Sequence, residues 1–278
     1  MSLQYDFHTH TRYSDGTLSP AQLVRAAAGA GVRALAITDH DVTDALAEAA
    51  PIAKDCGLQL VPGVEISATW SNKTIHVLGL GIDPAHSALQ AGLARLRELR
   101  DARAEDMGAR LAKHGIANAL AGARALAAGP IISRTHFAHF LVKAGHVREL
   151  RQAFKQFLAK GKPGYVSQAW AGIDEAVSWI RAAGGRAVIA HPGRYDLGTA
   201  ALGRLFEDFR AAGGEGIEVI SGSHSRDDYH RFAHFAREFG FLASAGSDYH
   251  GPENVWLHLG QLPDFPSPCK PVWHDWNL

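Results

Sequence analysis

Segments with the pattern of a β-strand alternate with segments with the pattern of an α-helix along most of this chain. Strand-like runs end in polar residues, as in VRALAITDHD (residues 32–41) and RAVIAHPG (residues 186–193). Helix-like runs carry capping signals, as in SPAQLVRAAAGAG, where Ser19 precedes a proline and the run stops at a glycine. This βαβα order predicts a parallel sheet with flanking helices. With about seven strands in order, a closed or distorted barrel is favoured over a doubly wound sheet.

Residues 99–165 interrupt this alternation. The segment is rich in Ala, Arg and Lys, has helical periodicity and contains no convincing strand. Within PIISRTHFAHFLVKAGHV we expect a helix that begins near Ser133 and stops at Gly145. We therefore expect a barrel built from residues 1–98 and 166–278, with a small helical insertion that covers the active site.

The formal net charge is zero, with 28 basic and 28 acidic residues, but the charges are unevenly placed. Between Arg100 and Lys162 the sequence has 12 basic and 4 acidic residues. A basic segment suits an anionic substrate and an acidic remainder suits metal binding, although ordinary solvated helix faces would give the same counts. The zero net charge argues against a broad electrostatic grip on long nucleic acid.

The composition also indicates the class and compartment of the protein. Hydrophobic residues make up 46% of the chain, enough for a substantial core. We expect no membrane span, because no apolar run of about 18 residues exists, and the N-terminus does not have the pattern of a signal peptide. Cys56 and Cys269 lie far apart and fit a reducing cytoplasm better than a disulfide scaffold. We expect a cytoplasmic protein that is a monomer or a weak oligomer.

Histidines and carboxylates gather where the apolar strand runs end. In α/β barrels these ends meet at one face, so residues far apart in the sequence converge there. The candidates are six imidazoles and three carboxylates, namely His8, His10, Asp15, His40, Glu65, His76, His191, Asp248 and His250. One of them, His76, sits inside its run, and we expect it to point inward. Nitrogen and oxygen ligands without thiolates suit Zn²⁺, Mn²⁺ or Fe²⁺, and this many ligands can hold two or three ions, with Glu65 as a bridge.

Each motif alone is weak, because a His-X-His pair often ends a strand with both imidazoles already satisfied. Their joint occurrence at strand ends favours a metal centre, since scattered structural histidines have no reason to collect there. His224, in ISGSH, also follows a strand-like run and is a further candidate.

The order of the motifs resembles a known family. FHTHTRYSDGTLSP, AITDHD, PGVEIS, IHVLG, AVIAHPGRY and SAGSDYHG together look like the polymerase and histidinol phosphatase (PHP) family of metal-dependent phosphoesterases. The match runs over nearly the whole chain and implies a distorted (β/α)₇ barrel. The basic segment, with ISRTHFAHFLVKAGHV and KGKPGYVSQ, resembles the stand-alone branch. That branch is similar to 3′,5′-nucleoside bisphosphate phosphatases, some also described as 5′→3′ exonucleases on short oligonucleotides.

The resemblance implies three sets of metal ligands. The first comprises His8, His10, Glu65 and Asp248; the second Glu65, His76 and His191; the third Asp15, His40 and His250. Position 15 departs from the pattern, because some relatives have histidine there. A carboxylate is the harder ligand and favours Mn²⁺ or Fe²⁺ over Zn²⁺ at the third set, so we expect two to three ions, with Mn²⁺ first.

Clustered divalent ions lower the pKa of a bound water and neutralise charge on a phosphoryl group, so we expect a phosphoric monoester hydrolase. Glu65, His191 and His224 are the candidate catalytic residues, with His224 as the acid for the leaving sugar hydroxyl. Arg134 lies beside Ser133 at an expected helix start, where anions are favoured, and could instead be an ordinary exposed helix residue. Arg134, Arg194 and His224 are the candidate substrate-binding residues.

Three other functions fit parts of this pattern. Histidinol phosphate is a candidate substrate, although a small cation would not need a basic segment. A barrel amidohydrolase or deaminase would use one or two ions and leave the third ligand set idle. A non-catalytic nucleotide- or metal-binding protein would bind without turnover. The main prediction is hydrolysis of the 3′-phosphate of nucleoside 3′,5′-bisphosphates, such as adenosine 3′,5′-bisphosphate, with short oligonucleotide ends as further substrates.

Overall fold

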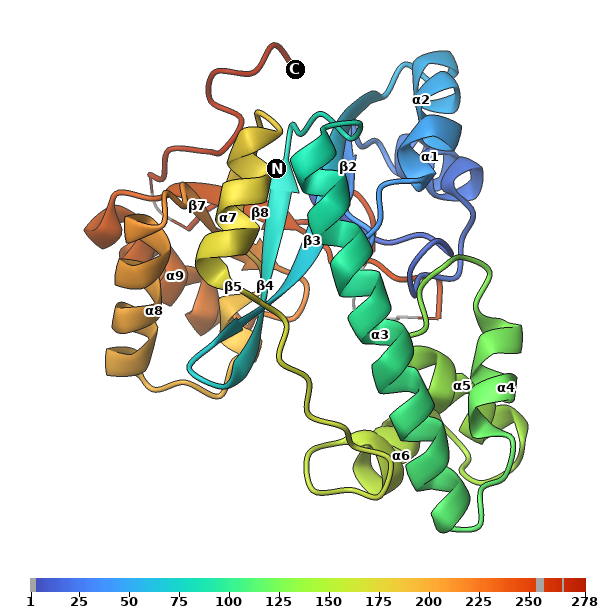
Figure 1. Cartoon of the computed structure of the whole chain (residues 1–278). Helices are drawn as coiled ribbons and strands as arrows, with labels where there is room; N and C mark the ends of the chain where they lie inside the picture. Colours follow the sequence, from blue (N-terminus) through green and yellow to red (C-terminus); the bar gives the residue numbers. More distant parts are fainter. Residues whose placement is uncertain (1–3, 254–257, 267) are drawn as a thin grey trace.

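The computed structural model describes residues 4–253, 258–266 and 268–278 (Figure 1). The elements of this part are β1 (Tyr5–Thr9), α1 (Pro20–Gly29), β2 (Ala34–Ile37), α2 (Ala45–Asp55), β3 (Gln59–Trp70), β4 (Lys73–Leu80), α3 (Ser87–Lys113), α4 (Ala119–Leu126), α5 (Arg134–Lys143), α6 (Leu150–Ala153), the π-helical turn η1 (Phe154–Leu158), β5 (Ala171–Gly172), α7 (Ile173–Ala182), β6 (Arg186–Ile189), the 3₁₀ turn η2 (Pro192–Arg194), α8 (Thr199–Ala211), β7 (Gly216–Ser221), α9 (Arg226–Phe239) and β8 (Leu242–Gly246).

The expected helix starts at Ser19 and Ser133 are confirmed. Each serine side chain accepts a hydrogen bond from a backbone N–H of the first turn, in α1 and α5 respectively. The stop at Gly145 is also confirmed, because α5 ends two residues earlier and Gly145 takes a positive φ of 77°.

The strands form one sheet in the order β1-β2-β3-β4-β6-β7-β8, and the short β5 pairs with β3. Most neighbours are parallel, as expected, but β4 is antiparallel to both β3 and β6. The expectation of an all-parallel sheet is therefore wrong at β4. Only Ser71 and Asn72 connect β3 to β4, and both have positive φ. A two-residue connection makes a hairpin and is far too short for a crossover to a parallel strand.

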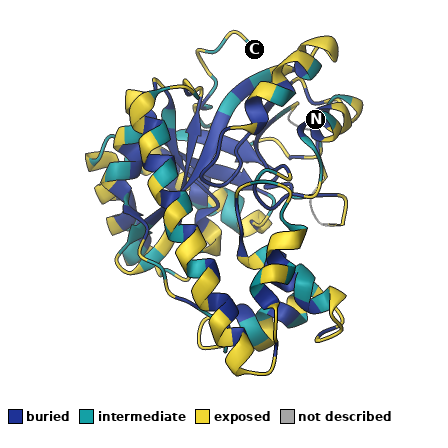
Figure 2. Cartoon of the chain, turned by 45° about the vertical axis from the view of Figure 1, so that its right-hand side comes forward, coloured by how far each residue is buried: buried dark blue, intermediate teal, exposed yellow. Residues whose placement is uncertain are grey.

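The sheet curls until its first and last strands approach each other, which gives a nearly closed, distorted barrel. The backbone N–H of Asp248, just after β8, donates to the carbonyl of His8 in β1 at 2.8 Å, and the N–H of His10 donates to the carbonyl of Tyr249 at 2.9 Å. In Figure 1, α1 and α2 lie at one side of the sheet and α7, α8 and α9 at the other. The main hydrophobic core fills the space between the sheet and α3, α7, α8 and α9, and a separate cluster packs α1 and α2 against the sheet; buried residues are dark blue in Figure 2.

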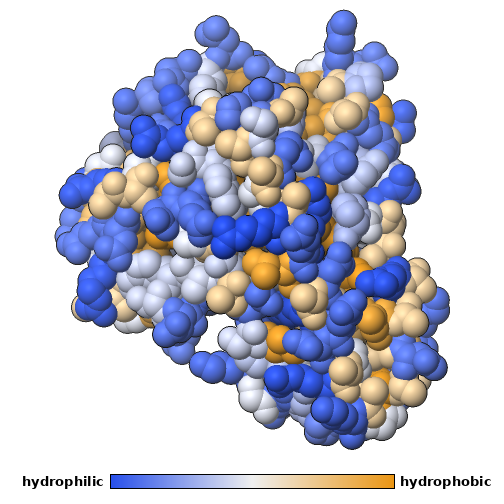
Figure 3. Space-filling view, viewed as in Figure 1, coloured by the Kyte–Doolittle hydropathy of each residue, from blue (hydrophilic) through white to orange (hydrophobic). Residues whose placement is uncertain are grey.

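Residues 104–166 form a helical lobe with a hydrophobic core of its own. Met107, Leu111, Phe137 and Leu141 are among the buried side chains of this second core. The lobe is the protrusion at the lower right of Figure 3, where apolar and hydrophilic side chains mix on its surface. The expected boundary at residue 99 falls inside α3, which runs without a break from the barrel into the lobe. Among the described residues, no helix is both long and apolar enough to cross a membrane.

Candidate active site

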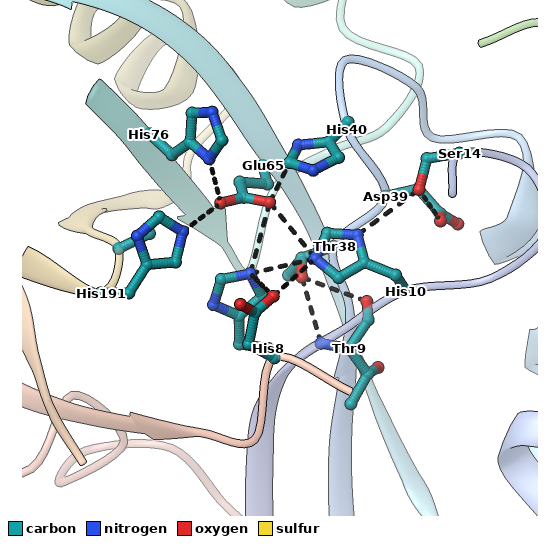
Figure 4. Close-up of polar contacts among 12 residues, drawn as sticks. His8, Thr9, His10, Ser14, Thr38, Asp39, His40, Glu65, His76 and His191 are labelled. Carbon is teal, nitrogen blue, oxygen red and sulfur yellow. Dashed lines mark hydrogen bonds and ion pairs between the residues drawn. The ribbon is translucent and has the colours of Figure 1, made fainter. Parts of the chain in front are cut away.

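The candidate metal ligands come together at one end of the barrel. His8 lies in β1, Glu65 in β3 and His76 in β4, while His191 and Asp248 follow directly on β6 and β8. Figure 4 shows the carboxylate of Glu65 at the centre, with imidazoles pointing toward it from several strands. His76 points inward from within its strand, as expected. Glu65, His8 and His10 are fully buried.

Glu65 directs its two carboxylate oxygens at two different sets of imidazoles. Its Oε1 lies 2.8 Å from His76 Nδ1 and 3.0 Å from His191 Nε2. Its Oε2 lies near three nitrogens, at 3.4 Å from His8 Nε2, 3.2 Å from His10 Nε2 and 2.9 Å from His40 Nδ1. Burial alone would raise the pKa of Glu65, but the facing rings of His40 and His76 hold it well below its ordinary value.

Two further carboxylates complete the cluster. Asp248 Oδ1 lies 3.3 Å from both His8 Nε2 and His10 Nε2. Asp15 Oδ1 lies 3.2 Å from His250 Nε2 and 3.7 Å from His40 Nε2. These distances join the side chains into one continuous cluster, in which His40 lies closer to Glu65 than to Asp15, so they do not by themselves separate the three implied sets. The ligand roles themselves remain predictions.

The chemistry of this donor set fits divalent cations. His8 Nε2 and His10 Nε2 lie only 3.1 Å apart, with carboxylate oxygens on both sides. Burial disfavours a charged ring at His10, yet its hydrogen bonds to Asp248 and Glu65 raise its pKa to about 10. The cluster therefore has a surplus of negative charge that must attract either protons or metal ions. Its ligand atoms form several groups of three or four that lie within 4.8 Å of one another, close enough to share an ion.

Glu218 supports two of the candidate ligands and was missed from the sequence. This fully buried carboxylate in β7 places its Oε1 2.9 Å from His8 Nδ1, and its other oxygen accepts the backbone N–H of His191. The contact fixes the tautomer of His8 and turns its Nε2 toward the centre, as a carboxylate behind a metal-bound histidine does. Its signal in the sequence is a single acidic residue inside the apolar run GIEVIS, a pattern that an exposed edge strand would share.

Asp39 holds the loop between His10 and Asp15. Its carboxylate accepts the backbone N–H and the hydroxyl of Thr11 at 2.7 and 2.6 Å, and the hydroxyl of Ser14 at 2.6 Å. The loop is tight at Gly16, where an added Cβ would lie 2.5 Å from the carbonyl oxygen of His10. Asp39 thus positions ligand candidates without facing the centre itself.

Two of the candidate ligands have strained backbones. His191 has a φ of 27° and Asp248 a φ of 55°, in the left-handed region that non-glycine residues rarely occupy. Such conformations cost about 1–3 kcal/mol each and persist where surrounding structure enforces them. The hydrogen bond from His191 N–H to Glu218 and that from Asp248 N–H to His8 supply this constraint.

Arginines of the lobe and of η2 form one wall of the pocket above the centre. Arg134 stands at the start of α5, and Arg194 donates to Asp248 Oδ2 at 2.8 Å. Arg100 and Arg103, both on α3, also line the pocket and were missed from the sequence. Arg100 is committed to Asp41, with 2.6 Å between its Nε and the Oδ2 of that residue.

Arg103 differs from Arg100 because its buried Nε has no hydrogen-bond partner among the described residues. Its guanidinium lies over the ring of Trp170, 5.5 Å from the centroid. Burial, together with the nearby charges of Arg134 and Arg100, lowers the pKa of Arg103 to about 9. An arginine in this setting is poised to gain an anionic partner.

His224 is not brought to the pocket. Its ring is buried against Phe232, its Nε2 accepts the backbone N–H of Gly193 at 3.0 Å, and its Nδ1 lies 3.1 Å from the carbonyl of Val219. Both ring nitrogens are therefore used by the backbone, and the contacts give His224 a structural role in holding the turn after His191. The expected role as acid and substrate ligand does not fit this placement.

Comparisons with known proteins agree with the fold. The sequence model of the family described as PHP domain matches residues 6–166. A relative from Chromobacterium violaceum, described as a 3′,5′-nucleoside bisphosphate phosphatase, is 51% identical over 271 residues, which are 97% of this chain and 95% of the relative. A relative from Haemophilus influenzae, described as a 5′-3′ exoribonuclease, is 42% identical over 273 residues, or 98% and 99% of the two chains.

A solved structure from Chromobacterium violaceum, described as an amidohydrolase with bound sulfate and no metal, has a TM-score of 0.93 and 50% sequence identity, and the match covers 98% of this chain and 95% of that chain.

Proposed function

This chain belongs to the PHP domain family, and on that basis we propose that it removes the 3′-phosphate of nucleoside 3′,5′-bisphosphates, such as adenosine 3′,5′-bisphosphate. The observation that carries the proposal is a wall of arginines directly beside the cluster of imidazoles and carboxylates, in which the buried Nε of Arg103 has no partner among the described residues. A bisphosphate needs both parts, because one phosphate reacts while the other must be held. Cleavage of short oligonucleotides from the 5′ end is a second proposed activity, supported by the likeness to the exoribonuclease.

Two to three divalent ions would be held by the three ligand sets, with Mn²⁺ first and Fe²⁺ or Zn²⁺ as alternatives. The carboxylate of Asp15 supports the harder ions, since imidazole there would suit Zn²⁺ better. When bound, such ions lower the pKa of a water molecule and neutralise charge on the phosphoryl oxygens. Glu65 joins the first two sets because each of its oxygens faces a different group of imidazoles.

Different arginines bind the two phosphates of the substrate. We assign the non-reacting phosphate to Arg103 and Arg134, which line the same pocket. Burial lowers the pKa of both guanidinium groups, and the charge of Arg134 lowers the pKa of Arg103 further. Arg194 lies closer to the metal ligands through its contact with Asp248, and we assign it to the reacting phosphoryl group. Residues from α3, from the start of α5 and from the stretch between η1 and β5 line the pocket, so we propose that the lobe covers the active site.

Phosphate release from adenosine 3′,5′-bisphosphate with Mn²⁺ is the direct test, run beside two competing assays. Histidinol phosphate tests the phosphatase alternative. Ammonia release from nucleosides tests the deaminase alternative, which the description of the solved neighbour as an amidohydrolase makes worth including. Ammonia release without phosphate release would refute the proposal.

Substitution of Arg103 or Arg134 by alanine tests the assignment of the second phosphate. We expect kcat/KM for adenosine 3′,5′-bisphosphate to fall roughly 10- to 100-fold, because a charge-assisted contact with phosphate is lost. Hydrolysis of adenosine 3′-monophosphate, which lacks the second phosphate, should change little. Arg124→Ala is the matched control, since Arg124 is exposed on α4 and does not line the pocket. Equal losses on both substrates would contradict the assignment.

A further inference from the structure

A second groove lies beside the pocket, between the loop after β1 and the helices α4 and α5. Arg12, Leu126, His139, Val142 and Lys143 line it, together with Asp15. None of the proposed roles uses these residues, apart from Asp15. The groove therefore needs an explanation of its own.

Asp15 connects the groove to the metal centre. This residue lines both the groove and the pocket, and its Oδ1 faces His250 on the pocket side. Its Oδ2 accepts the hydroxyl of Thr135 at 3.1 Å. The Asp15–Thr135 pair thus lies where the two spaces adjoin. A chain that leaves the centre over this pair enters the groove directly.

The groove combines positive charge with an apolar surface. Arg12 and Lys143 are exposed, and no carboxylate among the described residues pairs with either side chain. Leu126 and Val142 are half-buried and add apolar surface between them. Free cations beside apolar surface suit a nucleotide, because the sugar–phosphate backbone meets the charges and the base covers the apolar side chains.

We propose that this groove binds the nucleotide on the 3′ side of the scissile phosphate in a short single-stranded oligonucleotide. The proposal rests on the proposed function. With the 5′-phosphate of the first nucleotide held by Arg103 and Arg134, the phosphorus attached to its 3′ oxygen reaches the metal centre. A nucleoside bisphosphate ends there, whereas an oligonucleotide continues past Asp15.

The same bond breaks in both substrates. Water adds its oxygen to phosphorus, the bond between phosphorus and the 3′ oxygen breaks, and that oxygen takes a proton. With a bisphosphate the products are a nucleoside 5′-monophosphate and free phosphate. With an oligonucleotide the phosphate stays on the shortened chain as its new 5′-phosphate. One centre thus acts on both lengths, and the groove adds affinity only for the longer one.

Charge reversal at Lys143 tests the proposal. We expect Lys143→Glu to lower kcat/KM for a 5′-phosphorylated RNA trinucleotide about tenfold, mainly through KM, because one phosphate contact is replaced by repulsion. Hydrolysis of adenosine 3′,5′-bisphosphate should change less than about twofold, because that substrate does not reach the groove. Lys143→Ala should give a smaller loss with the same selectivity.

Arg124→Glu is the matched control, because it reverses the same charge on the lobe outside both the pocket and the groove. Thermal unfolding of each variant checks that the fold is kept. An equal loss on both substrates, an unchanged trinucleotide rate, or a wild-type enzyme that does not cleave the trinucleotide would each overturn the groove proposal. A wild-type enzyme without activity on the bisphosphate would instead refute the proposed function.

Discussion

At the scale of single residues, Glu65 and Glu218 make the centre possible in different ways. Glu65 shares its two oxygens between two groups of imidazoles. Glu218 contacts Nδ1 of His8 and accepts the backbone N–H of His191. Burial of two carboxylates in a protein interior is costly unless each is fully partnered. Here the imidazoles provide the partners, so the positions of both groups are fixed together.

Glu218→Gln should weaken metal binding and activity without abolishing the fold. The amide keeps the shape of the side chain but loses the negative charge beside His8 Nδ1. Loss of a carboxylate that orients a metal-bound histidine costs about 10- to 100-fold in metal affinity or activity. Metal content after dialysis and phosphate release measure the effect. Glu215→Gln, a nearby change just before β7, should leave both unchanged. Full metal content and full activity in Glu218→Gln would contradict the role assigned here.

Most of the candidate ligands, but not all of the residues that support them, could be predicted from the sequence. The nine ligand candidates could be named because they lie in or just after apolar runs of the sequence, although the structure places Glu65, like His76, inside its strand and Asp15 in the loop after β1. Glu218 could not, because a lone acid in a strand is equally consistent with an exposed edge. His224 also follows a strand, but both nitrogens of its ring contact the backbone instead of facing the pocket. A sequence pattern does not reveal which hydrogen-bond partner a ring nitrogen will have.

At the scale of elements, α3 links the barrel and the lobe. Leu89, Leu93 and Leu96 pack into the main core, and Met107 and Leu111 pack into the core of the lobe. These positions recur every three or four residues, so one stripe of the helix faces inward along its whole length. Arg100 occupies the middle of that stripe and reaches Asp41 and Ser67 beside the centre. The helix continues through residue 99, so it has no break at the expected boundary between the barrel and the lobe.

Gly92 tests the packing of α3 against α7. Alanine usually stabilises a helix by about 1 kcal/mol relative to glycine, but a Cβ at Gly92 would lie 2.4 Å from the ring of Trp179. We expect Gly92→Ala to lower the free energy of unfolding by about 1–3 kcal/mol through overpacking. Gly203→Ala in α8 has open space around it and should stabilise instead. Urea unfolding of both variants checks the opposite signs, and stabilisation by both would show that Trp179 moves aside freely.

At the scale of the whole molecule, the candidate ligands tie together strands from both ends of the chain. His8 from β1, Glu65 from β3, His191 after β6 and Asp248 after β8 meet in one buried cluster. The closing of the barrel at β1 and β8 brings the outermost two together, so the barrel and the centre form as one unit. The barrel class could be predicted from the alternation of elements. The reversed β4 could not, because the hydrophobic pattern of a strand carries no direction.

Removal of the metal ions should therefore destabilise the whole barrel. Without cations, the buried carboxylates lose their strongest partners, and a ligand that binds only the folded state stabilises it by an amount that grows with its concentration. We expect treatment with a chelator to lower the Tm, and added Mn²⁺ to restore it. Differential scanning calorimetry with and without chelator measures the shift. An unchanged Tm would mean that the cluster is held by protons rather than ions.

The contact between β1 and β8 determines when the barrel can close during synthesis of the chain. During synthesis, His8 and His10 leave the ribosome long before Asp248 and His250. The hydrogen bond from the backbone N–H of Asp248 to the carbonyl of His8 can form only after Asp248 has been made. A growing chain thus brings the four candidate ligands of the first set together only after β8 has been made. Because contacts between residues so far apart in the sequence form slowly, we expect the closure of the barrel to be a late step of folding.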